Sequence, residues 1–96
     1  MVTALVLINT ARNSVNEVAE ALVEIDGVTE VYSVAGKYDL IALLRVADNE
    51  AMADLVTRHI LEVEGIVSSE TLLAFRVHSK FDLESIFDLG SEQARN

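Results

Sequence analysis

The 96-residue sequence contains no cysteine and no proline, and it has few basic side chains. Without cysteine the chain has neither disulfides nor thiolate chemistry, which is compatible with a reducing cytoplasm. Seven lysines and arginines stand against sixteen aspartates and glutamates, so the formal net charge is −9. Nucleic-acid binders gain affinity by neutralising phosphates with basic side chains. The charge balance therefore argues against direct nucleic-acid binding by this chain.

A long hydrophobic run is also missing. Residues 1–8 are apolar, but they lack the basic flank of a secretory signal and fall far short of the roughly 20 residues that a membrane span needs. A chain of this length forms one domain and buries only roughly 60–65% of its unfolded surface. We expect a cytoplasmic single-domain protein with no membrane partner.

Apolar periodicity predicts four strands and two helices. Continuous apolar or β-branched runs predict strands over residues 2–9, 28–35, 40–47 and 66–78, the second and third joined as a hairpin. Apolar residues at i, i+3, i+4 and i+7 predict helices between the first and second and between the third and fourth strands. The second helix carries His59 on its apolar positions, together with Met52, Leu55, Val56, Ile60 and Val63.

Polar residues and glycines mark the expected helix ends. Ser14 and Glu17 have the spacing of a capping box, and Asp48 or Asn49 is placed to cap the second helix. Gly27 and Gly65 are expected to end the two helices. They lie in a repeated junction, because the sequence EIDGV at residues 24–28 recurs as EVEGI at residues 62–66.

The resulting order is βαββαβ, with two similar halves. This pattern predicts an α+β, ferredoxin-like fold: an antiparallel sheet of strand order 4-1-3-2 with both helices on one face. We expect residues 1–80 to form this domain and residues 81–96 to form a C-terminal extension that is partly helical and then frayed.

Both faces of the predicted sheet are apolar. In the first strand Val2, Ala4, Val6 and Ile8 alternate with Thr3, Leu5 and Leu7, and the third strand shows the same pattern. Two helices cover one face only, and a soluble monomer rarely exposes an apolar patch above a few hundred Å². A second copy stacked sheet against sheet about a two-fold axis is the economical cover, so we expect a homodimer.

No catalytic, metal-binding or cofactor motif is present. His59 and His78 lie outside any metal-binding spacing, so a packing or interface role is expected for His59 and a solvated strand end for His78. No serine lies in a G-x-S-x-G elbow, and no glycine belongs to a phosphate-binding loop. We therefore expect no catalytic residues, no metal ligands and no cofactor.

The segment from Ser33 to Asp39 is the most informative part of the chain for ligand binding. Gly36 exposes backbone polar groups, and the Asp39 carboxylate can accept hydrogen bonds from an ammonium group. An ordinary turn, with Gly36 at positive φ and a local Asp39 contact, explains the same residues. Ser69 and Thr71 share one face of the fourth strand and offer hydroxyls nearby.

Residues 1 to about 78 resemble the effector-binding domain of the Lrp/AsnC (feast/famine) transcription regulators. The resemblance lies in the order of a strand, a helix, the motif VxxVYSVAGKYDL, a second helix and the motif EGIxxSxT. The resemblance implies a dimer of facing sheets (a dimeric α/β barrel or sandwich) that assembles into tetramers or octameric rings. It also implies a small effector, typically an amino acid, bound where dimers meet. Asp39 would hold the α-ammonium group, and the ligand-binding residues would be Gly36, Lys37, Tyr38, Asp39, Ser69 and Thr71.

Regulators of that family carry an N-terminal helix-turn-helix, whereas the first strand here is predicted to begin at residue 2. The resemblance thus implies a stand-alone, non-catalytic sensing and oligomerisation module. A pure assembly partner of a helix-turn-helix-bearing paralogue is an alternative. A small dimeric α/β-barrel enzyme of the monooxygenase or isomerase type is another, and it would bring His59 and Tyr32 together between sheet and helices.

Overall fold

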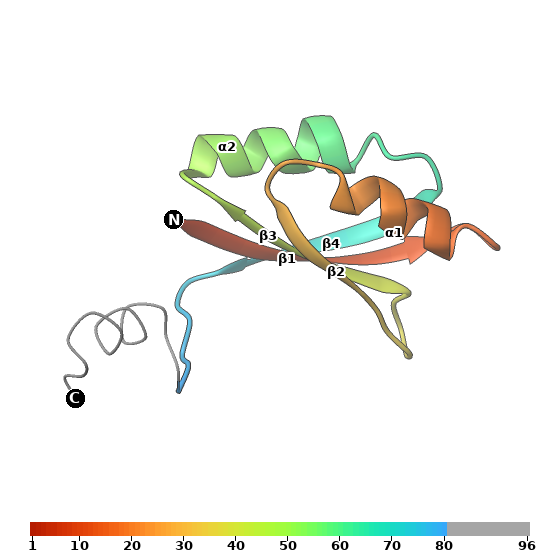
Figure 1. The fold of residues 1–96 in the computed structure, drawn as a ribbon, viewed down its shortest axis with the longest axis horizontal. Helices are drawn as coiled ribbons and strands as arrows, with labels where there is room; N and C mark the ends of the chain where they lie inside the picture. Colours follow the sequence, from red (N-terminus) through yellow and green to blue (C-terminus); the bar gives the residue numbers. More distant parts are fainter. Residues whose placement is uncertain (81–96) are drawn as a thin grey trace.

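The computed structural model describes residues 1–80, so the expected extension over residues 81–96 lies outside the described part. The sheet has the strand order β2-β3-β1-β4, antiparallel throughout, which confirms the predicted 4-1-3-2 arrangement. Both helical segments lie on one side of it (Figure 1). The elements are β1 (Val2–Thr10), α1 (Val15–Val23), β2 (Val28–Ser33), β3 (Leu40–Val46), α2 (Asn49–Asp54), a π-helical turn η1 (Leu55–Ile60) and β4 (Ile66–Ala74).

Alternate residues of the two central strands form the core. We call this helix-covered side the closed face; its central residues, all 0% exposed, are Ala4, Val6, Ile8, Leu40, Ala42 and Leu44. Val18 and Leu22 of α1, Met52 of α2, and Leu55 and Ile60 of η1 complete the core. Each large aliphatic side chain buried here contributes about 1.5–3 kcal/mol. Within residues 1–80 we find no helix long and apolar enough to cross a membrane.

The other side of the sheet has the second set of alternating residues. The strand register places Leu5 beside Leu43 of β3 and Leu72 of β4, and Leu7 beside Ile41. We call this side the open face; its apolar residues are Leu5, Leu7, Ile41, Leu43 and Leu72. The first four are partly buried by their neighbours, and Leu72 is 44% exposed. The prediction that both faces are apolar is confirmed.

The capping box predicted for α1 is wrong. Ser14 precedes the helix and its carbonyl accepts from the Val18 N–H at 2.9 Å, but its side chain makes no capping hydrogen bond. Its φ of −114° and ψ of 5° differ from the extended conformation that directs a hydroxyl toward the first-turn N–H groups. The helix also ends at Val23, before Gly27, because residues 24–27 form separate turns.

The repeated glycines have matching roles in the closed-face core. Gly27 and Gly65 have φ of +100° and +101°, which glycine adopts without a steric cost. A Cβ at Gly27 would lie 2.8 Å from Leu55 Cδ2, and one at Gly65 would lie 2.7 Å from Val18 Cγ2. Each glycine therefore lets a core side chain of the other half approach closely, which gives the EIDGV and EVEGI repeat a packing reason.

The second helix starts as predicted and then changes geometry. Asp48 caps α2, its carboxylate accepting from the Ala51 N–H at 2.8 Å. From Leu55 the chain forms the wider π-helical turn, in which the Leu61 N–H donates to the Val56 carbonyl. This turn exposes His59 while Ile60 stays fully buried. The expectation that His59 lies on the apolar side of the helix is therefore wrong: His59 does not pack in the core of its own chain.

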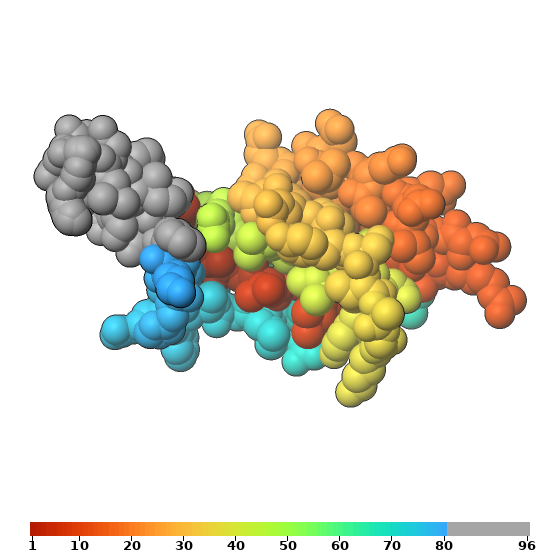
Figure 2. Space-filling view, turned by 60° about the horizontal axis from the view of Figure 1, so that its bottom comes forward, coloured from red at the N-terminus to blue at the C-terminus, as the bar shows by residue number. Residues whose placement is uncertain are grey.

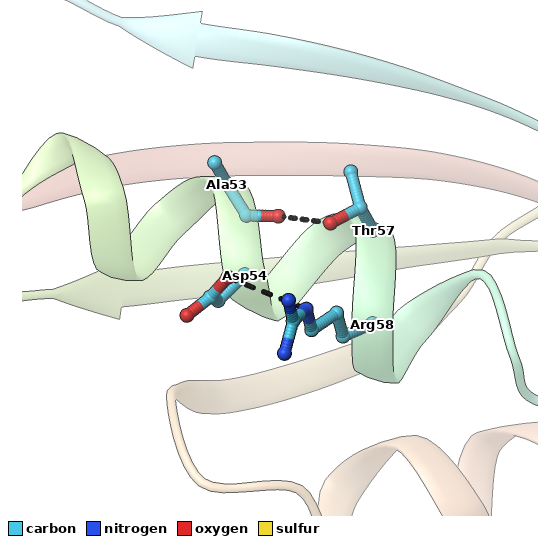
Figure 3. Close-up of polar contacts among 4 residues, drawn as sticks. All are labelled: Ala53, Asp54, Thr57 and Arg58. Atoms are coloured by element: carbon cyan, nitrogen blue, oxygen red, sulfur yellow. Dashed lines mark hydrogen bonds and ion pairs between the residues drawn. The ribbon is translucent and has the colours of Figure 1, made fainter.

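Polar contacts brace the junction of α2 and η1 on its outer side (Figure 3). The Thr57 hydroxyl donates to the Ala53 carbonyl at 2.7 Å. Arg58 Nε lies 3.7 Å from Asp54 Oδ1, and both side chains are largely exposed. Exposed ion pairs of this kind contribute at most about 1 kcal/mol.

Two strands end two or more residues earlier than predicted, and β3 ends one residue earlier, at Val46. β2 ends at Ser33 rather than residue 35, because the Val34 N–H already closes the hairpin loop on the Asp39 carbonyl. β4 ends at Ala74 rather than residue 78. Ala74 pairs with Thr3, and β1 begins one residue earlier, so β1 offers little further backbone to pair with.

Candidate ligand-binding site

The loop between β2 and β3 projects beyond the sheet (Figures 1 and 2). A 3.1 Å hydrogen bond from the Val34 N–H to the Asp39 carbonyl closes it. Gly36 lies at the tip with φ of +132°, and beyond its two chain neighbours no residue has a heavy atom within 4 Å of the place a Cβ would occupy. Lys37 beside it is exposed. The tip thus presents backbone polar groups and one cation to the surroundings.

Asp39 fastens this loop to the end of β1. Its Oδ2 accepts from the Thr10 backbone N–H at 2.9 Å and lies 3.4 Å from the Thr10 hydroxyl, which also donates to it. The Asp39 N–H donates to the Ile8 carbonyl at 2.9 Å. The contact reaches across to the neighbouring strand, unlike the local turn contact considered above. A carboxylate has about four acceptor positions, so Asp39 retains capacity for a ligand.

Tyr38 extends from the same loop over the open face. Its hydroxyl donates to Glu70 Oε1 at 2.7 Å, and Glu70 lies beside Leu7 on that face. This hydrogen bond raises the pKa of Tyr38 above its ordinary value, because the carboxylate stabilises the protonated phenol. Sequence reasoning did not select Glu70 or Thr10, since only the strand register shows that they meet the loop.

Ser69 and Thr71 lie on the closed-face side of β4. They pair with Ile8 and Val6, whose side chains point into the core. Both are nevertheless exposed, because α1 and α2 pack mainly over β2 and β3. The predicted sharing of one strand face is confirmed. Within one chain, however, these hydroxyls and Tyr38 lie on opposite faces at the same end of the sheet.

Two shallow surface hollows lie elsewhere, along α1. One, of about 450 Å³, runs between α1 and residues 63–65, and the other, of about 440 Å³, adjoins the start of α1. Neither includes any of the six predicted ligand-binding residues. Among residues 1–80, no group of three histidine, cysteine, aspartate or glutamate side chains is placed to hold a metal ion.

The open face presents five apolar side chains that neither helical segment covers. Figure 2 brings this face forward, with β1 in red between β3 and β4. Polar side chains border its aliphatic centre: Glu30 and Tyr32 on β2, Arg45 on β3, and Glu70 on β4. Tyr32 donates a hydrogen bond to Glu30, and this bond raises the Tyr32 pKa. An apolar centre with a polar rim is the usual anatomy of a protein interface.

Comparison with known proteins gives one family. The family model described as the Lrp/AsnC ligand binding domain matches residues 3–82. The solved structure of TTHA0845 from Thermus thermophilus is 50% identical, with a TM-score of 0.78; the match covers 83% of this chain and 100% of that one. The regulator LrpA1 from Halobacterium salinarum is 32% identical over 69% of this chain and 46% of its own length.

A more distant structure shares only the fold. NMB0573 from Neisseria meningitidis, solved as an L-Met complex, is 14% identical with a TM-score of 0.71, covering 88% of this chain and 58% of that one. The curated relatives are named as transcriptional regulators of the helix-turn-helix type. The chain spans about half of their length or less, between 39% and 52% for the first three.

Proposed function

Because the chain belongs to the Lrp/AsnC ligand binding domain family, we propose that it is a non-catalytic module that senses a small molecule and assembles with copies of itself. Residues 1–80 form the sensing and oligomerisation domain, residues 81–96 extend it, and the protein acts in the cytoplasm in transcription regulation. The proposal rests above all on the open face, whose aliphatic centre no element of the described chain covers.

A second copy is the cover that fits this face best. Two identical sheets can stack about a two-fold axis with their aliphatic centres in contact and their polar rims outside. Within one chain, four aliphatic side chains of this face stay only partly buried: Leu5, Leu7, Ile41 and Leu43. Association with a second copy would remove their remaining apolar surface from water. Such dimers would further associate into tetramers or octameric rings.

The ligand in this proposal is an amino acid bound at the loop from Gly36 to Asp39. Asp39 receives the ammonium group, and the backbone at Gly36 and the side chains of Lys37 and Tyr38 surround the rest. Ser69 and Thr71 lie on the other side of the sheet. A pocket that includes them is therefore completed by a neighbouring copy, whose own loop or β4 approaches from that side.

The two candidate residues of the enzyme alternative do not lie together in the structure. It requires His59 and Tyr32 to meet between sheet and helices, but His59 is exposed on η1 and Tyr32 lies on the open face, 49% exposed. The assembly-partner alternative keeps one supporting observation. With a net charge of −9, the described domain is poorly suited to contact nucleic acid itself, and a DNA-binding paralogue would supply that contact in a mixed assembly. Co-purification with such a paralogue, without any ligand response, would favour this alternative.

A calorimetric screen of the proteinogenic amino acids tests the sensing role. We expect one or a few to bind, and we expect Asp39→Asn to abolish that binding. The amide of this variant can still accept from Thr10, so the loop keeps its anchor while the charge is lost. Asp26→Asn, an exposed carboxylate at the opposite end of the sheet, is the matched control and should bind normally. Absence of binding by every amino acid would refute the ligand class.

A further inference from the structure

A row of three apolar side chains continues from β4 into the residues that follow it. Leu73 lies on the closed-face side, because it pairs with the fully buried Ala4. Phe75 and Val77 follow it at two-residue spacing in a stretch without helix, and such spacing keeps side chains on one side of an extended chain. The three side chains are 51%, 94% and 64% exposed. We call Leu73, Phe75 and Val77 the apolar row; within residues 1–80, α1 and α2 pack mainly over β2 and β3 and leave it uncovered.

The sequence that follows the row has the start and stop signals of a short helix. Ser79 and Asp82 have the spacing of a capping box, and Gly90 is placed to end a helix. The family match ends at residue 82, so most of this segment is additional to the family's domain. The sequence therefore predicts a helix that begins directly after the apolar row.

This predicted helix has one apolar side. Three apolar residues recur at i, i+3 and i+4, which places them on one helical face: Leu83, Ile86 and Phe87. The opposite side has Glu84, Ser85 and Asp88. A helix of this length is marginal in water on its own, so it needs an apolar surface to pack against.

The apolar row and the predicted helix match in length. An extended chain from residue 73 to residue 77 spans about 13 Å. Residues 81–89 span about 13 Å as a helix. A helix that turns back after Ser79 would place Leu83 over Val77 and, about one turn further, Phe87 over Phe75. The uncovered row and the apolar side of the helix are thus complementary in length and in chemistry.

From these observations we infer that residues 81–89 fold back as a helix and cover the apolar row of their own chain. The tether selects the same chain over a second copy. Only five residues separate Val77 from Leu83, and a short linker gives an effective concentration of roughly millimolar. The contact makes the C-terminal segment a cover that withholds the row from other apolar surfaces. It requires neither the proposed ligand nor the proposed dimer.

Paired cysteines in the full chain test this placement, because the natural chain has no cysteine to compete. Phe75→Cys combined with Phe87→Cys joins two positions that the folded-back helix brings together. Phe75→Cys combined with Asp88→Cys is the matched control, since residue 88 lies on the opposite side of the helix. We expect the first pair to form a disulfide within one chain several-fold faster than the control pair.

Hydrogen exchange in single variants is an independent measurement that leaves the helix sequence unchanged. In the natural chain, the amides of residues 83–89 should exchange about tenfold or more slowly than in a free peptide of the same sequence. Phe75→Ser should abolish this protection, because it removes the side chain that Phe87 contacts. Arg76→Ser, on the other side of the extended chain, is the control and should retain it.

Equal disulfide rates for the two cysteine pairs, or equal protection in Phe75→Ser and Arg76→Ser, overturn the inference. Disulfides that join two chains, seen as a doubled mass on a denaturing gel, also overturn it, because another copy then covers the row. Sedimentation of the natural chain separates this inference from the proposed function. A monomer that passes both tests contradicts the proposed assembly alone, whereas a dimer that fails them contradicts the helix cover alone.

Discussion

The two faces of the sheet are made of the same kinds of side chain and differ in what covers them. On the closed face, Ala4, Val6 and Ile8 of β1 are 0% exposed under the two helical segments. On the open face, Leu5 and Leu7 of the same strand are only partly buried. One strand therefore supplies both a core and an interface. Folding of one chain buries the closed-face side chains of β1, whereas association with a second copy is needed to bury its open-face side chains.

The largest difference between the faces is expected for matched leucines of β3. Leu44→Ala opens a cavity in the closed-face core and should lower the free energy of unfolding by about 2–5 kcal/mol. This loss should be similar at low and high protein concentration in urea titrations. Leu43→Ala, on the open face, should instead weaken the dependence of stability on protein concentration. Equal behaviour of the two variants would mean that the faces are not distinct.

A second, smaller contrast lies between two glycines. Gly27→Ala places a methyl group 2.8 Å from Leu55 in the closed-face core and forces alanine to φ of +100°. We expect a loss of about 1–3 kcal/mol in thermal or urea unfolding. Gly36→Ala should cost less, because only the backbone conformation is strained and no atom lies within 4 Å. A larger cost at Gly36 would show that the loop packs against something at its tip.

Asp39 links the ligand loop to β1, and its two variants separate anchoring from charge. Asp39→Ala leaves the partly buried Thr10 N–H without its acceptor and should destabilise the fold by about 1–2 kcal/mol. Asp39→Asn keeps an acceptor and should lose less than half as much. Chemical denaturation of both variants, without ligand, measures this. If both lost the same amount, the anchor would depend on the charge rather than on the hydrogen bond.

The smallest effect concerns the Tyr38–Glu70 contact on the open face. The raised pKa of Tyr38 means that the folded chain favours the protonated phenol. The contribution of this contact to the free energy of unfolding is therefore fully present below pH 10.0, the ordinary pKa of tyrosine. As pH rises through 10 toward the folded-state pKa, the unfolded chain loses the proton first and this stabilisation disappears. Tyr38→Phe should show a shallower decline in unfolding midpoint above pH 10. Tyr32→Phe should have a similar effect, because its hydrogen bond to Glu30 raises the Tyr32 pKa as well, and the variant with both changes should show the shallowest decline. An unaltered decline in the double variant would contradict this origin of the pH dependence.

The sequence was sufficient to predict the strand order, because its two similar halves and the apolar alternation admit few topologies. It also predicted the Asp48 cap, a contact within one helical turn. The sequence did not predict that the Ser14 side chain makes no capping hydrogen bond, because this depends on the backbone conformation of Ser14. It also did not predict that His59 is exposed, because the π-helical turn changes which residues face the core. The predicted β4 was too long, because β4 can pair only as far as its partner β1 extends, and this limit depends on the tertiary arrangement of the two strands. The Tyr38–Glu70 and Asp39–Thr10 contacts depend on register between distant segments, which no local pattern contains.

The central claim is that a second copy of the chain covers the open face. Sedimentation equilibrium at micromolar concentration measures it most directly, with Leu7→Glu as the variant that places a charge at the centre of that face. We predict that the natural chain sediments at twice its 10.5 kDa mass or a higher even multiple. We predict that Leu7→Glu sediments as a folded monomer with an unchanged circular dichroism spectrum. A natural chain that stays at 10.5 kDa would contradict the account.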